Sequence, residues 1–544
     1  MSIQRKQSEV EVKERGTVRV FLNLSLTALL ASGVWGANDA RLVQAAQAGD
    51  AGALRTRLAD GADVNSTDTE GSTALHWAIH RDDAAMVDAL LTAGANPNLA
   101  SRYKVAPMSL AAQNGNVALV TRLLKAGASP DSVSEEGQTA LMTAARNGST
   151  EVVRALLTSG AKINTAEEFR GQTPLMFAAG EGNTGAAELL LEFGADLKAK
   201  SKAGLTPLLF AVRNNRLETV KFLLERGANA NDALPDGTAA LNMAVLNADF
   251  DLAALLLDKG ADPNHVDPRG HPLHVVVWLH KPGAPPDFAM NGLDPQPVAQ
   301  PSGRLGHLDI AKKLLEKGAD PNALVTLKEG RFAPGGGLSR NPPLLQIGRH
   351  YLSYEGSTPF YLAARNGDIA MMRLLTQFGA DPKRPTKHGV TPLMAAACLD
   401  YYEGETAGPY SGVPEAERLE AVKFAHQLGN DINGRTNFGT YTMIGTPQDT
   451  LLRYPDNIQD LLNLSVGDMR FNQMTPLHGA AICNQPSIVE YLISQGAVLN
   501  AKNQLGWTPL MVTGGLYIAN GKKENPVAAE ILRKAMTARG IPVE

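Results

Sequence analysis

Residues 171–182 read GQTPLMFAAGEG, and variants of this stretch return along most of the chain. Thr173 can accept a backbone N–H at the start of a helix, and Pro174 suits the first helical position, where no N–H is needed. Ala178 and Ala179 are small enough for neighbouring helices to approach each other, and Gly182 suits a tight turn. We therefore expect a short helix that begins at Pro174 and ends in a turn at Gly182.

A leucine-rich segment follows each copy of the stretch. Leu189, Leu190 and Leu191 would bury a second helix, which Gly194 ends with a left-handed cap. A helix pair of this kind cannot bury its apolar face alone, so it must stack on similar pairs. The glycine that opens the stretch returns about every 33 residues, and Lys104 takes its place once: Gly71, Gly137, Gly171, Gly204, Gly237 and Gly270. This period predicts a solenoid.

The recurring words resemble the ankyrin repeat from about Asp39 to Ile541, with insertions between them. The resemblance implies an all-α repeat fold, in which each β-turn finger leads into two antiparallel helices. We count about 12 units, including a degenerate N-terminal cap at residues 39–65 and a C-terminal cap. The later units start near Ser66, Leu99, Ser132, Thr165, Lys198, Asp232, His265, Gly356, Lys383, Gln473 and Ala501.

The period divides the chain into a regular array at residues 38–280 and an interrupted one at residues 281–544. The interruptions are expected at residues 281–305, 323–355, 399–417, 434–472 and 514–525. Insertions in repeat proteins occur in loops, commonly on the binding side. Tyrosines gather in or beside them, and tyrosine combines a large contact area with a polar end.

Residues 1–37 differ in kind from the array. Arg15 and Arg19 precede the apolar residues 20–30, and small residues follow, which is typical of a secretory signal peptide. The apolar stretch is short for a membrane span, so we expect a periplasmic or secreted chain without a stable span after cleavage. Because Glu9, Glu11 and Glu14 lie upstream, an uncleaved anchor or a disordered tail remains open.

The composition argues against two classes of function. The 51 basic and 55 acidic side chains give a formal charge of −4 without a long run of either sign, so nucleic-acid binding is not expected. The sequence contains no nucleophile elbow, Walker loop, HExxH or CxxC motif. We expect no enzyme activity and no cofactor.

The most plausible function is a non-enzymatic scaffold that binds another protein through its concave face and its tyrosine- and arginine-rich insertions. In proteins that the chain resembles, partners contact the residues beside the marker glycine and the end of the first helix. Together with the insertion tyrosines, the candidates are Tyr103, Arg146, Arg170, Arg213, Trp278, Arg365, Tyr401, Tyr402, Tyr410, Tyr441 and Tyr454. Trp278 and Tyr103 are expected to face outward, because a purely structural surface would have little use for them there.

A small-ligand or metal-binding module at residues 265–280 is the alternative, since His265, His271 and His274 are crowded there. His274 also has a structural interpretation, because it fills the TPLH position that family members use to hydrogen-bond the neighbouring finger. The only two cysteines, Cys398 and Cys483, fall at similar positions of neighbouring units. Stacked helices lie about 8–10 Å apart and a disulfide needs about 5.5 Å between α-carbons, which favours free thiols and leaves a bridge open.

Overall fold

The computed structural model describes residues 39–134, 136–267, 270–280, 301–325, 356–399, 413–437, 472–514, 517–518, 521–522 and 524–543. The expected signal segment at residues 1–37 lies outside these ranges, as do Tyr401, Tyr402, Tyr410, Tyr441 and Tyr454.

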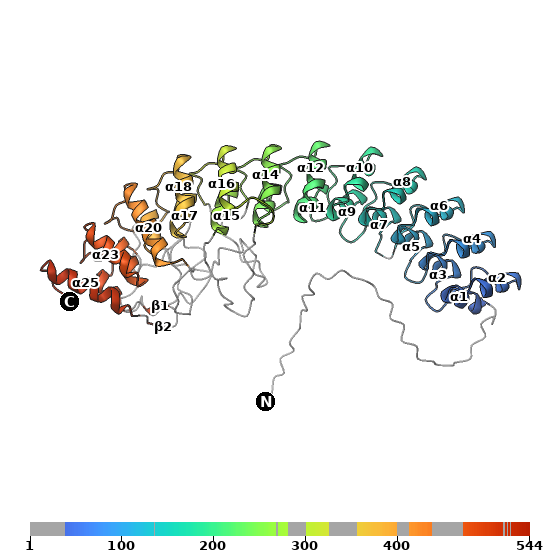
Figure 1. Cartoon of the computed structure of the whole chain (residues 1–544), viewed down its shortest axis with the longest axis horizontal. Coiled ribbons are helices and arrows are strands. Elements are labelled where there is room, and N and C mark those ends of the chain that lie inside the picture. The colour runs from blue at the N-terminus through green and yellow to red at the C-terminus, as the bar shows by residue number, and fades with distance from the viewer. Residues whose placement is uncertain are drawn as a thin grey trace, which may run out of the picture.

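Within the described residues, the chain forms 12 helix pairs stacked in one curved array (Figure 1). This confirms the predicted all-α repeat fold and its number of units. The first eight pairs are α1 Asp39–Ala48 and α2 Ala51–Ala59, α3 Ala74–His80 and α4 Ala84–Thr92, α5 Pro107–Asn114 and α6 Val117–Lys125, α7 Ala140–Asn147 and α8 Thr150–Thr158, α9 Pro174–Glu181 and α10 Thr184–Glu192, α11 Pro207–Arg213 and α12 Leu217–Glu225, α13 Ala240–Leu246 and α14 Phe250–Asp258, and α15 Pro272–Leu279 and α16 His307–Glu316. The last four are α17 Pro359–Arg365 and α18 Ile369–Gln377, α19 Pro392–Ala396 and α20 Glu415–Gln427, α22 Pro476–Ile482 and α23 Pro486–Ser494, and α24 Pro509–Val512 and α25 Pro526–Ala538.

The first helix of each pair lies on the inside of the arc and the second on the outside (Figure 1). Between α24 and α25, the two short strands β1 Tyr517–Ile518 and β2 Gly521–Lys522 pair antiparallel. None of the helices in the described ranges is both long enough and apolar enough to cross a membrane.

The marker glycines repeat because the backbone at that position is left-handed. Their φ angles run from +68° to +106° between Gly71 and Gly270. The finger is also crowded there, since a Cβ on Gly71 would lie 2.9 Å from the backbone nitrogen of Arg102. Lys104, the predicted stand-in, has a φ of +53°, and Gln473 occupies the same position with +62°. The period in the sequence is thus a period of backbone conformation.

Threonine caps begin most of the first helices. Thr206 accepts the N–H of Leu209 at 3.3 Å, and Pro207 occupies the first helical turn. Pro174 begins α9 and Thr173 is its N-cap residue, as predicted, with Thr173 and Met176 in the positions of a capping box. The amide of Thr173 donates to the Met176 sulfur at 3.4 Å, whereas the buried Thr173 hydroxyl has no hydrogen-bond partner.

An asparagine ladder joins the units along one edge of the array. Its members are Asn98, Asn231, Asn264, Asn322 and Asn433. Each Nδ2 donates to a glycine carbonyl of the next unit, and each Oδ1 accepts an N–H two residues further on. At Asn98 the two bonds measure 2.9 and 2.7 Å, and at Asn264 both measure 2.8 Å. The bond from Asn98 spans 29 residues of sequence and the bond from Asn264 spans 54, so the ladder continues across an insertion.

Candidate functional site

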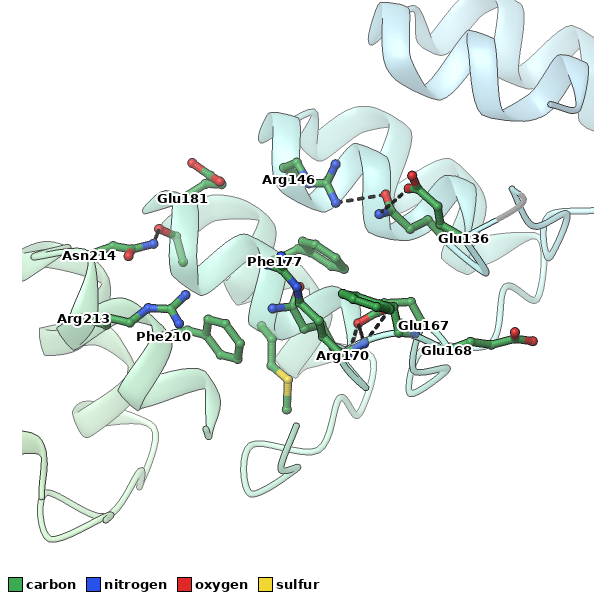
Figure 2. Close-up of a pocket in the computed structure, with 15 residues that line it drawn as sticks. Glu136, Arg146, Glu167, Glu168, Arg170, Phe177, Glu181, Phe210, Arg213 and Asn214 are labelled. Carbon is green, nitrogen blue, oxygen red and sulfur yellow. Dashed lines mark hydrogen bonds between the residues drawn. The ribbon is translucent and has the colours of Figure 1, made fainter. Parts of the chain in front are cut away.

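A hollow of about 870 Å³ opens over three successive units (Figure 2), beside helices that lie on the inside of the arc (Figure 1). The inner helices α7, α9 and α11 and the two fingers before α7 and α9 form its walls. It is lined by Glu136, Gln138, Arg146, Glu167, Glu168, Phe169, Arg170, Gln172, Met176, Phe177, Gly180, Glu181, Phe210, Arg213 and Asn214. Three of the arginines singled out in the sequence, Arg146, Arg170 and Arg213, are therefore brought together here.

Each of these arginines lies over a phenylalanine ring. The Arg146 Cζ lies 4.3 Å from the ring centre of Phe177, which belongs to the next unit. The Arg213 Cζ lies 4.9 Å from the centre of Phe210, one helical turn earlier on α11. A guanidinium that stacks on a ring covers its flat face and keeps its N–H groups at the edge, where they can donate to an acceptor.

Arg146 occupies the last turn of α7, at the end of a first helix. Its Nη2 donates to Gln138 Oε1 at 2.9 Å, which fixes the side chain across the finger (Figure 2). Burial lowers the pKa of Arg146, and the carboxylates of Glu181, Glu136 and Glu167 act in the opposite direction. Since a guanidinium in a protein stays protonated, Arg146 brings a half-buried positive charge to the hollow.

Glu167 holds the finger that presents the third arginine. Its carboxylate accepts the backbone N–H groups of Phe169 at 2.7 Å, Arg170 at 2.8 Å and Gln172 at 3.0 Å. Burial alone would raise the pKa of Glu167, but these N–H bonds, with the charge of Arg170, lower it overall. The finger is thereby fixed with the Phe169 ring 77% exposed and the Arg170 Cζ 5.7 Å from its centre.

The phenylalanines of the hollow were not predicted as site residues. Phe177 and Phe210 lie on helices whose apolar residues read as core, so nothing in their spacing separates them from packing residues. Phe169 did carry a signal, because a large apolar residue in an otherwise polar finger, TAEEFRG, has little structural reason to be there.

The other described candidates lie elsewhere. Tyr103 is exposed on the finger before α5, in agreement with the prediction, but it does not line the hollow. The outward position predicted for Trp278 is wrong, since the side chain is only 7% exposed. All residues of α15 are buried, and the helix packs against α13, α16 and α17. Arg365 of α17 lies over the Trp278 ring, 5.5 Å from its centre, so these two predicted residues do meet.

The histidines at residues 265–274 do not converge on a common point. His265 Nε2 lies 2.7 Å from the carbonyl oxygen of Gly237, His271 Nδ1 lies 3.0 Å from that of Asn264, and His274 Nε2 lies 3.0 Å from that of Ala323. Each ring thus bonds a different backbone carbonyl, and the described part of the chain contains no cluster of His, Cys, Asp and Glu fit for a metal ion. The hypothesis of a metal site here is not supported.

His274 fills the structural position that the sequence suggested. His76 Nε2 and His478 Nε2 reach the carbonyl oxygens of Val105 and Trp507 in the same way, at 3.0 and 3.1 Å. Unlike them, His274 has no threonine three residues earlier, because His271 stands there, and its Nδ1 is buried without a hydrogen-bond partner.

Comparison with protein families finds matches to ankyrin repeats along the array. A model of three ankyrin repeats matches residues 42–134, 108–201, 193–267 and 342–404, which together exceed half of the chain. A single ankyrin repeat matches residues 298–324 and 472–504.

Curated relatives match only parts of the chain. The transient receptor potential cation channel subfamily A member 1 of Drosophila melanogaster is 29% identical over 29% of this chain and 16% of its own length. The ankyrin repeat protein OPG189 of Variola virus (isolate Human/India/Ind3/1967) is 28% identical over 21% of this chain and 19% of its own length. The match thus spans less than a fifth of each relative. Among solved structures, the human ASB11 ankyrin repeat domain is 25% identical over 46% of this chain and all of its own length, with a TM-score of 0.37.

Proposed function

Since the chain belongs to the ankyrin repeat family, whose members are generally non-catalytic and typically bind other proteins, we propose that it is a scaffold that binds a protein partner in the hollow. The observation that carries the proposal is the set of three arginine–phenylalanine stacks on the inside of the arc. We call these six residues, Arg146, Phe177, Arg170, Phe169, Arg213 and Phe210, the stacked arginines and their rings.

The chemistry of the hollow favours a segment that carries carboxylates and an apolar side chain. The edges of the stacked guanidinium groups match a carboxylate with two parallel hydrogen bonds. Four glutamates line the hollow: Glu167 bonds the finger backbone, Glu181 pairs with Arg216 at 3.8 Å, Glu136 accepts from Gln138 at 3.2 Å, and Glu168 is exposed on the finger. The exposed Phe169 ring supplies an apolar contact beside them.

The spacing of the arginines sets the length of the segment. Arg146 and Arg213 lie on inner helices two units apart, and packed helices are separated by about 8–10 Å, so the two charges lie within about 20 Å of each other. An extended peptide advances about 3.3 Å per residue. The hollow therefore suits an extended segment with two acidic residues about five or six positions apart and an apolar residue between them.

A random peptide library displayed on phage, selected on the full chain, tests the site. We expect the selected peptides to combine acidic residues with an apolar one, and their affinity to fall about 5- to 30-fold for either Arg146→Gln or Arg213→Gln, as when one interface arginine is removed. Arg154→Gln is the matched control, since Arg154 is exposed on the outer helix α8.

Two results would contradict this assignment. One is selection of peptides without acidic residues, and the other is an equal loss of affinity in Arg154→Gln and in Arg146→Gln. Circular dichroism of each variant shows whether the array is still folded, so that a loss of binding is not a loss of structure.

The tyrosine- and arginine-rich insertions are the second part of the proposed surface. Their support is compositional, since Tyr401, Tyr402, Tyr410, Tyr441 and Tyr454 all fall in them. A chain from which residues 438–471 are removed should bind a peptide selected on the hollow as before, yet lose affinity for the intact partner protein.

Export is part of the proposal as well, on the strength of Arg15, Arg19 and the apolar residues 20–30. Expression of the full chain in a bacterium, followed by fractionation and N-terminal sequencing, tests it. A chain that stays in the cytoplasm with residues 1–37 attached would contradict it.

A further inference from the structure

The two cysteines lie side by side in the interior. Cys398 follows α19 and Cys483 follows α22, each directly after the first helix of its unit, and they are 3% and 6% exposed. Neither is part of a disulfide. The Cys483 sulfur lies 3.8 Å from the carbonyl oxygen of Cys398, and the Cys483 side chain lowers the pKa of the Cys398 thiol through hydrogen bonding.

Two features of the backbone explain the short distance. A Cβ on Gly479 of α22 would lie 2.5 Å from the carbonyl oxygen of Ala397 and 2.9 Å from the nitrogen of Leu399. Without a side chain at that position, α22 can sit directly on the turn that carries Cys398. Cys398 itself has a left-handed φ of +71°, a conformation rare for a residue with a side chain. Close approach and an unusual turn together bring the Cys483 sulfur to the backbone of Cys398.

The surroundings favour the reactive form of one thiol. The hydrogen bond with Cys483 lowers the pKa of Cys398, burial opposes this, and the positive charges of Arg418 and Arg365 add to the lowering. Arg418 is buried on α20, the second helix of the unit that carries Cys398. A thiolate next to a second thiol and a cationic side chain is the arrangement that supports thiol–disulfide exchange.

We propose that Cys398 and Cys483 form a reversible disulfide that joins two successive units of the array. The thiolate of Cys398 attacks one sulfur of a small disulfide, the S–S bond of that oxidant breaks, and one small thiolate leaves. The Cys483 thiol loses its proton and attacks the Cys398 sulfur of the mixed disulfide, which releases the second small thiol. Two protein thiols are oxidised, and one small disulfide is reduced to two thiols.

The bond would close a ring from residue 398 to residue 483. That ring contains α20 and both insertion segments, residues 400–412 and 438–471. In the reduced chain, packing and the hydrogen bond from Cys483 to the Cys398 carbonyl join the two units, whereas in the oxidised chain a covalent bond does. Because cross-linking restricts the unfolded chain, the oxidised array is expected to unfold at a higher urea concentration.

The test uses the folded full chain in buffers with a range of oxidised to reduced glutathione. After equilibration the samples are quenched in acid, alkylated in denaturant and weighed by mass spectrometry. We expect a species that has lost two hydrogen atoms and takes up no alkyl group, that returns to the dithiol form with excess reductant, and whose urea midpoint is higher.

The variants Cys398→Ser and Cys483→Ser serve as controls, because neither can form the internal bond. Each should keep one alkylatable thiol or carry one glutathione, with no shift in urea midpoint between oxidising and reducing buffer. If the folded wild type keeps two alkylatable thiols or carries two glutathiones in the most oxidising buffer, the proposal is overturned. Circular dichroism on the same samples verifies that the chain is folded, so slow access to the buried thiols is distinguished from unfolding.

Discussion

The buried histidine of α15 should make the array sensitive to acid. Burial lowers the pKa of His274 to about 3 from its ordinary value of 6.5, and the charge of His271 adds to the lowering, while the bonds to the carbonyls of Ala323 and Ser357 oppose it. The folded state therefore holds His274 neutral, and the unfolded state takes up a proton as the pH falls below about 6.5. The stabilisation that neutral His274 gives to the folded state is therefore complete above about pH 6.5 and is lost progressively as the pH falls from about 6.5 to about 3.

The size of the effect follows from these two values. At about pH 5 the unfolded chain carries nearly one proton more than the folded chain at His274, and the free energy of unfolding then falls by about 1.4 kcal/mol per pH unit. Between about pH 7 and about pH 5 the total loss is about 2 kcal/mol.

The perturbation is His274→Gln, because an amide keeps a donor near the carbonyl of Ala323 and does not titrate. Urea unfolding followed by circular dichroism, repeated across this pH range, gives the free energy of unfolding at each pH for the wild type and the variant. We expect the variant to be less stable at neutral pH and to lose about 2 kcal/mol less than the wild type on acidification. His80→Gln is the control, since His80 is exposed at the end of α3.

An unchanged pH slope in His274→Gln, or a slope reduced equally in His80→Gln, would refute the reasoning, because the proton uptake would then come from other groups. His478, which burial holds at a pKa of about 4, offers an independent repetition far along the array. The double variant should lose about twice the pH dependence of either single one.

Two further predictions concern the stability of the array. Phe250→Ala should lower the free energy of unfolding in urea by about 3–5 kcal/mol, because the ring is fully buried and its removal leaves a cavity. Phe193→Ala removes a half-exposed ring and should lower it much less. Equal losses in the two variants would contradict the burial argument. Lys104→Gly should raise the free energy of unfolding by up to about 1 kcal/mol, since glycine adopts the left-handed φ of +53° without strain. A less stable variant would show that the contacts of the lysine side chain contribute more than the strain costs.

Most of the fold could be predicted from the sequence because the repeat is a local rule used many times. The marker position requires a residue that adopts a left-handed turn, and the position after the cap requires proline or alanine. Each requirement falls on a single residue, so it appears as a period in the sequence. Even Lys104, which breaks the pattern of residue types, keeps the conformation that the pattern encodes. The number of units followed directly from that period.

The features that were wrong or missed depend on neighbours far away in the sequence. From the sequence of its own unit, Trp278 is expected to face outward, but Arg365 of α17 covers its ring. The contact between Cys483 and the backbone of Cys398 was missed because it depends on Gly479 and on an unusual φ at Cys398. For the hollow, the arginines were predicted from their positions, whereas the Arg146–Phe177 stack crosses between units and no single motif contains it.

Because of the asparagine ladder, the way in which two units stack does not depend on the number of residues between them. The same pair of bonds links neighbouring units whether their partners are 29 residues apart, as for Asn98, or 63, as for Asn433. A segment added between two rungs therefore does not shift the position of any later unit. Such a spine lets a gene lengthen, shorten or exchange its inserted segments over evolutionary time while the framework that displays them stays the same, as interchangeable loops do on an antibody domain.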